Sequence, residues 1–300
     1  MSALEDPVVH EYILGADENE RSRLLMQSEI HRAQAERLLD RLDVPSDGRV
    51  IDIGCGPLGV LDLLSTMVGR NGRAIGLDNE PRMIAHARRT IAKWKLANVE
   101  LVLADAADTG IEAGSLDLAH ERLVLINHPA PQNIVGEMTR IVRPGGWVAM
   151  EEVDTCSWIC EPAHPAWTEL LDALNGAWSA AGQDPFIGRR LPALLREAGL
   201  TDVGLDADAR VWQAGHPYQT LPLKFVSIFR ERMVAGGFIN AHRLDGLIAE
   251  TELHLAKPDT YVIHPLFFQA WGRKPADQVH EGNQTATGCT VAENASSAAP

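Results

Sequence analysis

Short runs of apolar, often β-branched residues recur along the first half of the chain, and amphipathic stretches lie between them. Apolar runs of about four to eight residues are typical of buried strands, whereas apolar positions that repeat at helical spacing predict helices. Strands that alternate with helices form a parallel sheet with helices on its faces. The strands that we predict in this half lie at 50–53, 73–77, 99–103, 115–119 and 147–150.

The pattern outside these strands predicts a helical N-terminal segment, a helical insertion and a tail. The pattern also predicts two more helices, at 164–181 and 187–198, and two more strands, at 203–212 and 261–271. Residues 214–258, between the last two strands, are too long for a turn and predict two helices. The apolar face of the first, which includes Phe225, is either core or a lid. The division that we predict is 1–48 (helical segment), 49–213 and 259–274 (core), 214–258 (insertion) and 275–300, a disordered tail rich in small and polar residues.

The first strand runs directly into a glycine turn, with the sequence VIDIGCGPLG at 50–59. Gly54 and Gly56 permit a tight turn and a close approach of backbone to ligand. A helix predicted at 58–67 would point its free N–H groups at this turn, which predicts a cradle for a nucleotide cofactor. Asp52 would repel the pyrophosphate of NAD. It suits S-adenosylmethionine (SAM), which has no phosphate and carries an ammonium and a sulfonium group.

This turn resembles motif I, D-x-G-x-G, of the class I SAM-dependent methyltransferases, with a third glycine at Gly59 instead of at position 58. The R-P-G-G turn at 143–146 and the A-W-G-R-K sequence at 270–274 resemble the same family. The chain is similar to bacterial small-molecule enzymes of this family, such as ubiquinone/menaquinone-biosynthesis and natural-product methyltransferases. The resemblance implies an α/β fold: a Rossmann-like, seven-stranded sheet with an N-terminal helical segment and a helical insertion before the last strand. It also implies SAM as the cofactor and methyl transfer as the activity.

Acidic residues lie at the carboxyl ends of five predicted strands, where open α/β sheets bind ligands. Asp78 has the spacing of an acid that binds ribose hydroxyls. The resemblance implies that Asp105 and Ala106 contact adenine, with Asp108 as the alternative acid for this role. It also implies that Glu121, with Arg122 beside it, borders the methionine half of SAM, and that Tyr12 and Gln27 reach the ligands from the N-terminal segment. The cofactor-binding residues that we predict are Tyr12, Gln27, Asp52, Gly54, Gly56, Asp78, Asn79, Asp105, Ala106 and Glu121.

A general base is needed only when the methyl acceptor must lose a proton. The catalytic candidates for this role are Glu151 and His128, with His120 as an alternative. The sequence does not decide whether carbon, nitrogen or oxygen is methylated. The helical N-terminal segment and the insertion predict an enclosed, compact and largely apolar acceptor, as in secondary metabolism or quinone-like biosynthesis.

The charge, the apolar runs and the cysteine spacing of the chain bear on whether it binds nucleic acid, membranes or metal. The net charge is −14 and no basic stripe is present, which argues against nucleic acid. No run of about 18 apolar residues occurs and the N-terminus is not signal-like, so we predict a cytoplasmic protein without a membrane partner. The four cysteines lack metal-like spacing, so no metal site is predicted. The sequence does not decide whether the protein forms a homodimer. The alternative functions are an NAD(P)-dependent oxidoreductase and a SAM-binding protein without catalysis.

Overall fold

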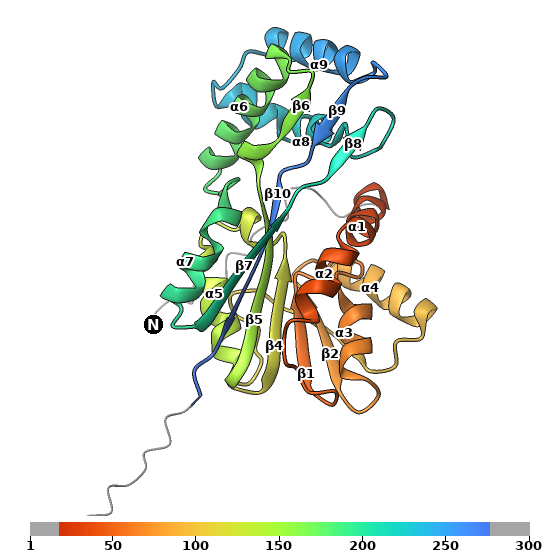
Figure 1. Cartoon of the computed structure of the whole chain (residues 1–300). Coiled ribbons are helices and arrows are strands. Elements are labelled where there is room, and N and C mark those ends of the chain that lie inside the picture. The colour runs from red at the N-terminus through yellow and green to blue at the C-terminus, as the bar shows by residue number, and fades with distance from the viewer. Residues whose placement is uncertain (1–17, 277–300) are drawn as a thin grey trace, which may run out of the picture.

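A computed structural model describes residues 18–276 of the chain. A seven-stranded sheet has the strand order β3-β2-β1-β4-β5-β10-β7 (Figure 1). The strands from β3 to β5 are mutually parallel, and β10 is antiparallel to both of its neighbours, β5 and β7. Their bounds are β1 Arg49–Ile53, β2 Arg73–Asp78, β3 Val99–Leu103, β4 Leu116–Arg122, β5 Val142–Asp154, β7 Thr201–Asp208 and β10 Leu266–Arg273.

Helices cover both faces of this sheet because its central strands are apolar on both sides. In β1, Ile51 and Ile53 belong to one buried cluster with α5 (Pro131–Ile141). Val50, on the opposite face, belongs to another cluster with α2 (Arg32–Leu39) and α3 (Leu61–Val68). The helix α4 (Pro81–Trp94) lies against β2 and β3, and α7 (Leu191–Glu197) lies against β7 and β10. This is the class I methyltransferase arrangement that the resemblance implied.

A second layer lies beyond the carboxyl end of β5, at the top of Figure 1, and we call it the cap. It consists of residues 155–183 and 209–265. A three-stranded sheet of β6 (Ile159–Glu161), β9 (Tyr261–Ile263) and β8 (Val211–Gln213) packs there with three helices. In the cap, α6 (Pro165–Ala180) contacts both α8 (Leu221–Ala235) and α9 (Ala241–Leu255). The predicted insertion of two helices corresponds to α8 and α9.

Several predicted boundaries differ from the structure because strands run from one sheet into the other. The strand predicted at 203–212 is two strands, β7 and β8, and that predicted at 261–271 is β9 and β10. Pro265, which cannot donate a ladder hydrogen bond, lies at the second break. Residues 159–161 and 211–213, which we assigned to the core, pair with β9 in the cap.

Two further boundaries differ near the glycine turn and in the centre of the sheet. The helix predicted at 58–67 begins at Leu61, because residues 56–60 form the turn itself. The strand predicted at 147–150 extends over 142–154. Its acidic residues are therefore paired within the strand and do not follow it. The N-terminal helical segment is interrupted at His31, between α1 (Glu18–Ile30) and α2. Among residues 18–276, no helix is long and apolar enough to cross a lipid bilayer.

Candidate active site

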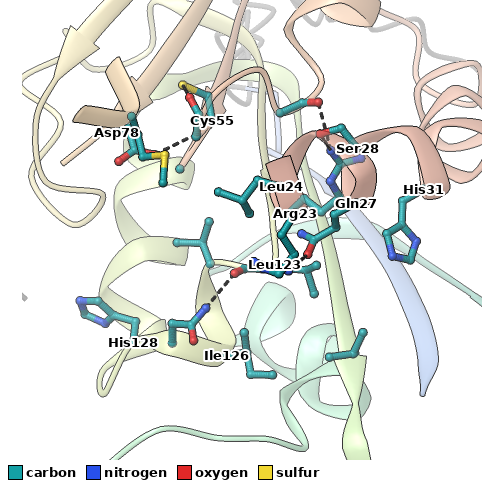
Figure 2. Close-up of a pocket in the computed structure, with 18 of the residues that line it drawn as sticks. Arg23, Leu24, Gln27, Ser28, His31, Cys55, Asp78, Leu123, Ile126 and His128 are labelled. Atoms are coloured by element: carbon teal, nitrogen blue, oxygen red, sulfur yellow. Dashed lines mark hydrogen bonds between the residues drawn. The ribbon is translucent and has the colours of Figure 1, made fainter. Parts of the chain in front are cut away.

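A continuous cavity lies between the carboxyl ends of the central strands, the helix α1 and the cap (Figure 2). Figure 2 shows Gln27, Ser28 and His31 on one side and Asp78 and His128 on the other. Eight of the predicted cofactor-binding residues line it, namely Gln27, Asp52, Gly54, Gly56, Asp78, Asn79, Asp105 and Ala106. The predicted catalytic residue His128 also lines it. Tyr12 lies outside the described residues, as does the predicted tail from 277 onward.

The glycine turn needs its glycines for two different reasons. Gly54, Gly56 and Gly59 all have positive φ, a backbone region that favours glycine. A Cβ at Gly59 would lie 1.9 Å from the Asp52 Oδ2, so no side chain fits there. A Cβ at Gly56 would meet only the Leu24 Cδ1, at 3.6 Å. The backbone at Gly56 is therefore open toward α1 and the cavity.

Asp78, the last residue of β2, ties the glycine turn to the next strand. Its Oδ2 accepts a hydrogen bond from the Gly56 N–H and its Oδ1 accepts one from the Glu80 N–H, both at 2.9 Å. Burial raises the pKa of Asp78, and these two hydrogen bonds oppose that rise. Each carboxylate oxygen keeps a further lone pair for a ligand.

The end of β3 completes the same wall of the cavity. Asp105 accepts a hydrogen bond from the Ala107 N–H at 2.7 Å, which fixes the carboxylate beside Ala106. Asp108, the other acid of this loop, is exposed and does not line the cavity. The structure thus brings together Asp78, Asn79, Asp105 and Ala106.

Arg122, the last residue of β4 and the neighbour of Glu121, lines the cavity. Its Nη2 donates to the Ser28 Oγ and to the Gly59 carbonyl oxygen, each at 3.0 Å. Its Nη1 lies 3.9 Å from the Glu151 Oε2 and has no hydrogen-bond partner within residues 18–276. A cation thus lines the cavity with one donor group unused.

Asp52, Glu121 and Glu151 differ most from their predicted roles, because they belong to the interior of the sheet. Asp52 borders the cavity, but its Oδ2 accepts from the Val60 N–H at 3.0 Å and its Oδ1 lies 2.8 Å from the His120 Nδ1. Glu121 and Glu151 are fully buried and do not line the cavity. Glu121 and Glu151 therefore do not lie where their predicted roles as a cofactor-binding and a catalytic residue require, whereas the cofactor-binding role of Asp52 stays a prediction.

His120 links two of these acids. Its Nε2 lies 3.3 Å from the Glu151 Oε2, while the Glu151 Oε1 accepts from the Gln269 Nε2 at 2.5 Å. Burial alone would lower the pKa of His120, but its hydrogen bonds to Asp52 and Glu151 outweigh burial and raise that pKa to about 9. At neutral pH the site contains a buried imidazolium held between two carboxylates.

A second buried pair, Glu121 and Glu152, lies beneath the loop after β4. Glu121 accepts a hydrogen bond from the Val124 N–H, and Glu152 accepts one from the Ile126 N–H. Burial raises the pKa of Glu152 to about 8 and raises that of Glu121 well above its ordinary value, with the charge of Glu152 as a further cause for Glu121. At neutral pH the Glu152 carboxyl therefore retains its proton.

The cap side of the cavity consists of residues that sequence reasoning missed or left undecided. Trp158, Trp178, Tyr218 and His264 line the cavity, and so does Phe225, which we had assigned to core or lid. They come from five separate segments of the chain. Besides the apolar helix face that includes Phe225, the sequence signal near these residues is His264-Pro265, which interrupts an otherwise strand-like run. Among residues 18–276, no group of three or more His, Cys, Asp or Glu residues is arranged to hold a metal ion.

Comparison with protein families gives a direct match. The family model described as a methyltransferase domain matches residues 45–199. A trans-aconitate 2-methyltransferase of Methylobacterium radiotolerans is 30% identical over 68% of this chain and 74% of its own length. A demethylmenaquinone methyltransferase of Bacillus mycoides is 26% identical over 58% of this chain and 78% of its own length.

In two further comparisons, the match covers a smaller share of the other protein's length. An uncharacterised 37.1 kDa protein of transposon TN4556 from Streptomyces fradiae is 29% identical over 72% of this chain, which spans 61% of that protein. Among solved structures, a phosphoethanolamine N-methyltransferase 2 of Haemonchus contortus, in complex with S-adenosylhomocysteine, has a TM-score of 0.55 at 16% identity. The match covers 89% of this chain and 60% of that one. At that identity the structural likeness concerns the fold alone.

Proposed function

Because this chain belongs to the methyltransferase-domain family, as a SAM-dependent methyltransferase, we propose that it methylates a small molecule enclosed between the sheet, α1 and the cap. The observation that carries this proposal is the continuity of the cavity, which extends from Asp78 and Asp105 at the strand ends to Trp178 and Phe225 in the cap. The family match sets aside the NAD(P)-dependent oxidoreductase alternative.

The residues at the strand ends fit SAM. We propose that Asp78 accepts hydrogen bonds from the ribose hydroxyls, and that Asp105 and the Ala106 N–H bind the adenine edge. The open backbone at Gly56 leaves room for a ligand beside the turn. The unused Nη1 of Arg122 would bind the carboxylate of the methionine half. SAM, when bound, supplies an electrophilic methyl group on a sulfonium whose leaving group is already good.

The protein's own contribution would be to exclude water and to hold the acceptor in line with the methyl group, because positioning can supply much of the acceleration of such a displacement. A cavity covered by the cap favours a compact acceptor. The two named relatives, trans-aconitate and demethylmenaquinone methyltransferases, are consistent with a small molecule. A role in secondary metabolism or in quinone-like biosynthesis is part of this proposal.

The test uses purified protein, methyl-labelled SAM and a cell extract as the source of acceptors. We expect the label to enter the small-molecule fraction, while S-adenosylhomocysteine binds the protein in calorimetry and NADH does not. Label recovered in precipitated protein or RNA would contradict the proposal.

Replacing Asp78 with alanine is expected to weaken S-adenosylhomocysteine binding by roughly 1.5–3 kcal/mol, about 10- to 150-fold, because hydrogen bonds to a charged group are lost. Isothermal titration calorimetry measures this change. Asp108→Ala is the matched control, since Asp108 is an exposed acid of the neighbouring loop, and its affinity should stay within about twofold of the original. Unchanged affinity in Asp78→Ala would refute the ribose assignment.

A further inference from the structure

We propose that the cap side of the cavity binds a phenol, a planar aromatic ring with an ionisable hydroxyl group, and that His264 is the general base that removes its proton. This inference rests on the proposed function, because it names the class of acceptor for the same site. It makes the enzyme an oxygen methyltransferase.

Aromatic side chains form the walls of this part of the cavity. The ring centroids of Trp158 and Trp178 lie 6.2 Å and 5.6 Å from that of Phe225. The ring of Tyr218 lies 6.0 Å from that of His264, and that of Trp158 lies 5.9 Å from it. Flat rings at these separations present faces and edges on which another aromatic ring can pack.

The same walls contain polar hydrogens without a partner. The Trp158 Nε1, the Trp178 Nε1 and the Tyr218 hydroxyl are buried and have no hydrogen bond within the described part of the chain. Burial raises the pKa of Tyr218 to about 12, so this hydroxyl remains protonated and able to donate. Because buried donors are nearly always paired in folded proteins, these three favour a ligand that carries oxygen acceptors.

An aromatic cavity can also bind a quaternary ammonium group, but the unpaired donors disfavour that occupant. A quaternary ammonium group has no oxygen acceptor, so it would leave the Trp158 Nε1, the Trp178 Nε1 and the Tyr218 hydroxyl without a partner. The oxygen of a phenol can accept from such donors while its ring packs on the aromatic walls.

His264 has the hydrogen-bond pattern of a base. Its Nδ1 lies 3.1 Å from the Pro265 carbonyl oxygen, which can only accept, so Nδ1 carries the hydrogen. The Nε2 of the neutral ring is therefore left with a lone pair. Burial lowers the pKa of His264 to about 4, so the ring is neutral at physiological pH. The titratable groups that face it are His31, with a ring centroid at 5.8 Å, Tyr218 and Arg210.

In the proposed step, the oxygen lone pair of the phenol forms the new bond to the methyl carbon of SAM, and the electron pair of the old carbon–sulfur bond stays on sulfur. The Nε2 of His264 takes the hydroxyl proton as this bond forms, because the hydroxyl becomes far more acidic as its oxygen gains the methyl group. The products are an aryl methyl ether and S-adenosylhomocysteine. The proton leaves His264 to water, so no oxidant, reductant or further reactant is needed.

The binding test compares phenols with their hydroxyl-free analogues: 7-hydroxycoumarin with coumarin, and 1-naphthol with naphthalene. The protein is loaded with S-adenosylhomocysteine, and tryptophan fluorescence reports affinity. We expect a phenol to bind at least about tenfold more tightly than its analogue. Trp178→Phe, which keeps the ring and removes the N–H, should reduce that preference roughly fivefold. Equal binding within both pairs would overturn the phenol assignment and leave the proposed function intact, whereas failure to bind S-adenosylhomocysteine would refute the proposed function itself.

The catalytic test follows methyl transfer to the phenol that binds. His264→Asn should bind it within about twofold but transfer methyl at least about 100-fold more slowly at pH 7. Its rate should recover as the pH rises, because solvent then supplies the phenolate. His242→Asn, at an exposed position on α9, should match the original protein. If His264→Asn transfers methyl at the original rate and with the original pH profile, the assignment of the base is overturned. If a phenol binds but accepts no methyl group, its assignment as the acceptor is overturned.

Discussion

Asp52→Ala is expected to lower the free energy of unfolding by about 3–5 kcal/mol, because it removes one partner of a buried ion pair. The His120 imidazolium, 0% exposed, would keep only Glu151 as a carboxylate partner at 3.3 Å. The Val60 N–H at the start of α3 would also lose its acceptor. Urea unfolding at pH 6, where His120 is protonated, measures the loss.

The control for this variant is Asp206→Ala, which breaks the exposed ion pair between Asp206 and Arg41. Exposed pairs contribute at most about 1 kcal/mol, so that variant should remain close to the original protein. A loss below about 1 kcal/mol in Asp52→Ala would show that the carboxylate is dispensable for folding. It would also revive the earlier prediction that Asp52 serves chiefly to contact the cofactor.

Between pH 5 and pH 8, Glu152 is expected to make the protein less stable as the pH rises, by about 3–4 kcal/mol. Its pKa is raised from an ordinary 4.5 to about 8, chiefly by burial, so the folded chain keeps a proton that the unfolded chain releases. The stabilisation from a raised pKa is fully present at pH values below the pKa of the unfolded chain. It is lost as the pH rises past the pKa of the folded chain. His120 acts in the same direction, from pH 6.5 to about 9.

Glu152→Gln isolates the contribution of Glu152, since glutamine has the shape of the protonated acid and does not titrate. We expect the variant to match the original protein at pH 5 and to be the more stable of the two at pH 8. Urea midpoints across this range measure the difference. Parallel stability curves for the two proteins would contradict the proton balance derived for the buried pair.

The residues that line the strand-end side of the cavity could be predicted because their signals are local. Gly54, Gly56 and Asp78 lie within one strand–turn–strand unit, and the chemistry of each follows from its position relative to a strand end. The role of Asp52 could not be predicted in this way. A strand-end acid in the sequence can face a ligand or a neighbouring strand, and here His120 on β4 pairs directly with Asp52 on β1.

The acceptor side could not be predicted because nothing local unites its residues. Trp158 and His264 are more than one hundred positions apart in the sequence. The two strands predicted at 203–212 and 261–271 were read as continuous, although each crosses from one sheet to the other. Glu151 was misassigned for a related reason. The extension of β5 to Asp154, with β10 paired along it, places Glu151 in the middle of a ladder opposite Gln269.

The connectivity of the cap also bears on how acceptor specificity can change. The cap is two separate stretches of chain, and β5, β7 and β10 each continue from the sheet into it (Figure 1). Transplanting the cap from one relative to another would require four matched junctions, one at each end of each stretch. Three of these junctions, after β5, after β7 and before β10, must also preserve strand pairing near the break, such as the hydrogen bond from the His264 N–H to the Arg210 carbonyl oxygen at 2.7 Å. Substrate diversification in this architecture therefore proceeds more readily by single substitutions in the aromatic walls than by recombination of whole modules.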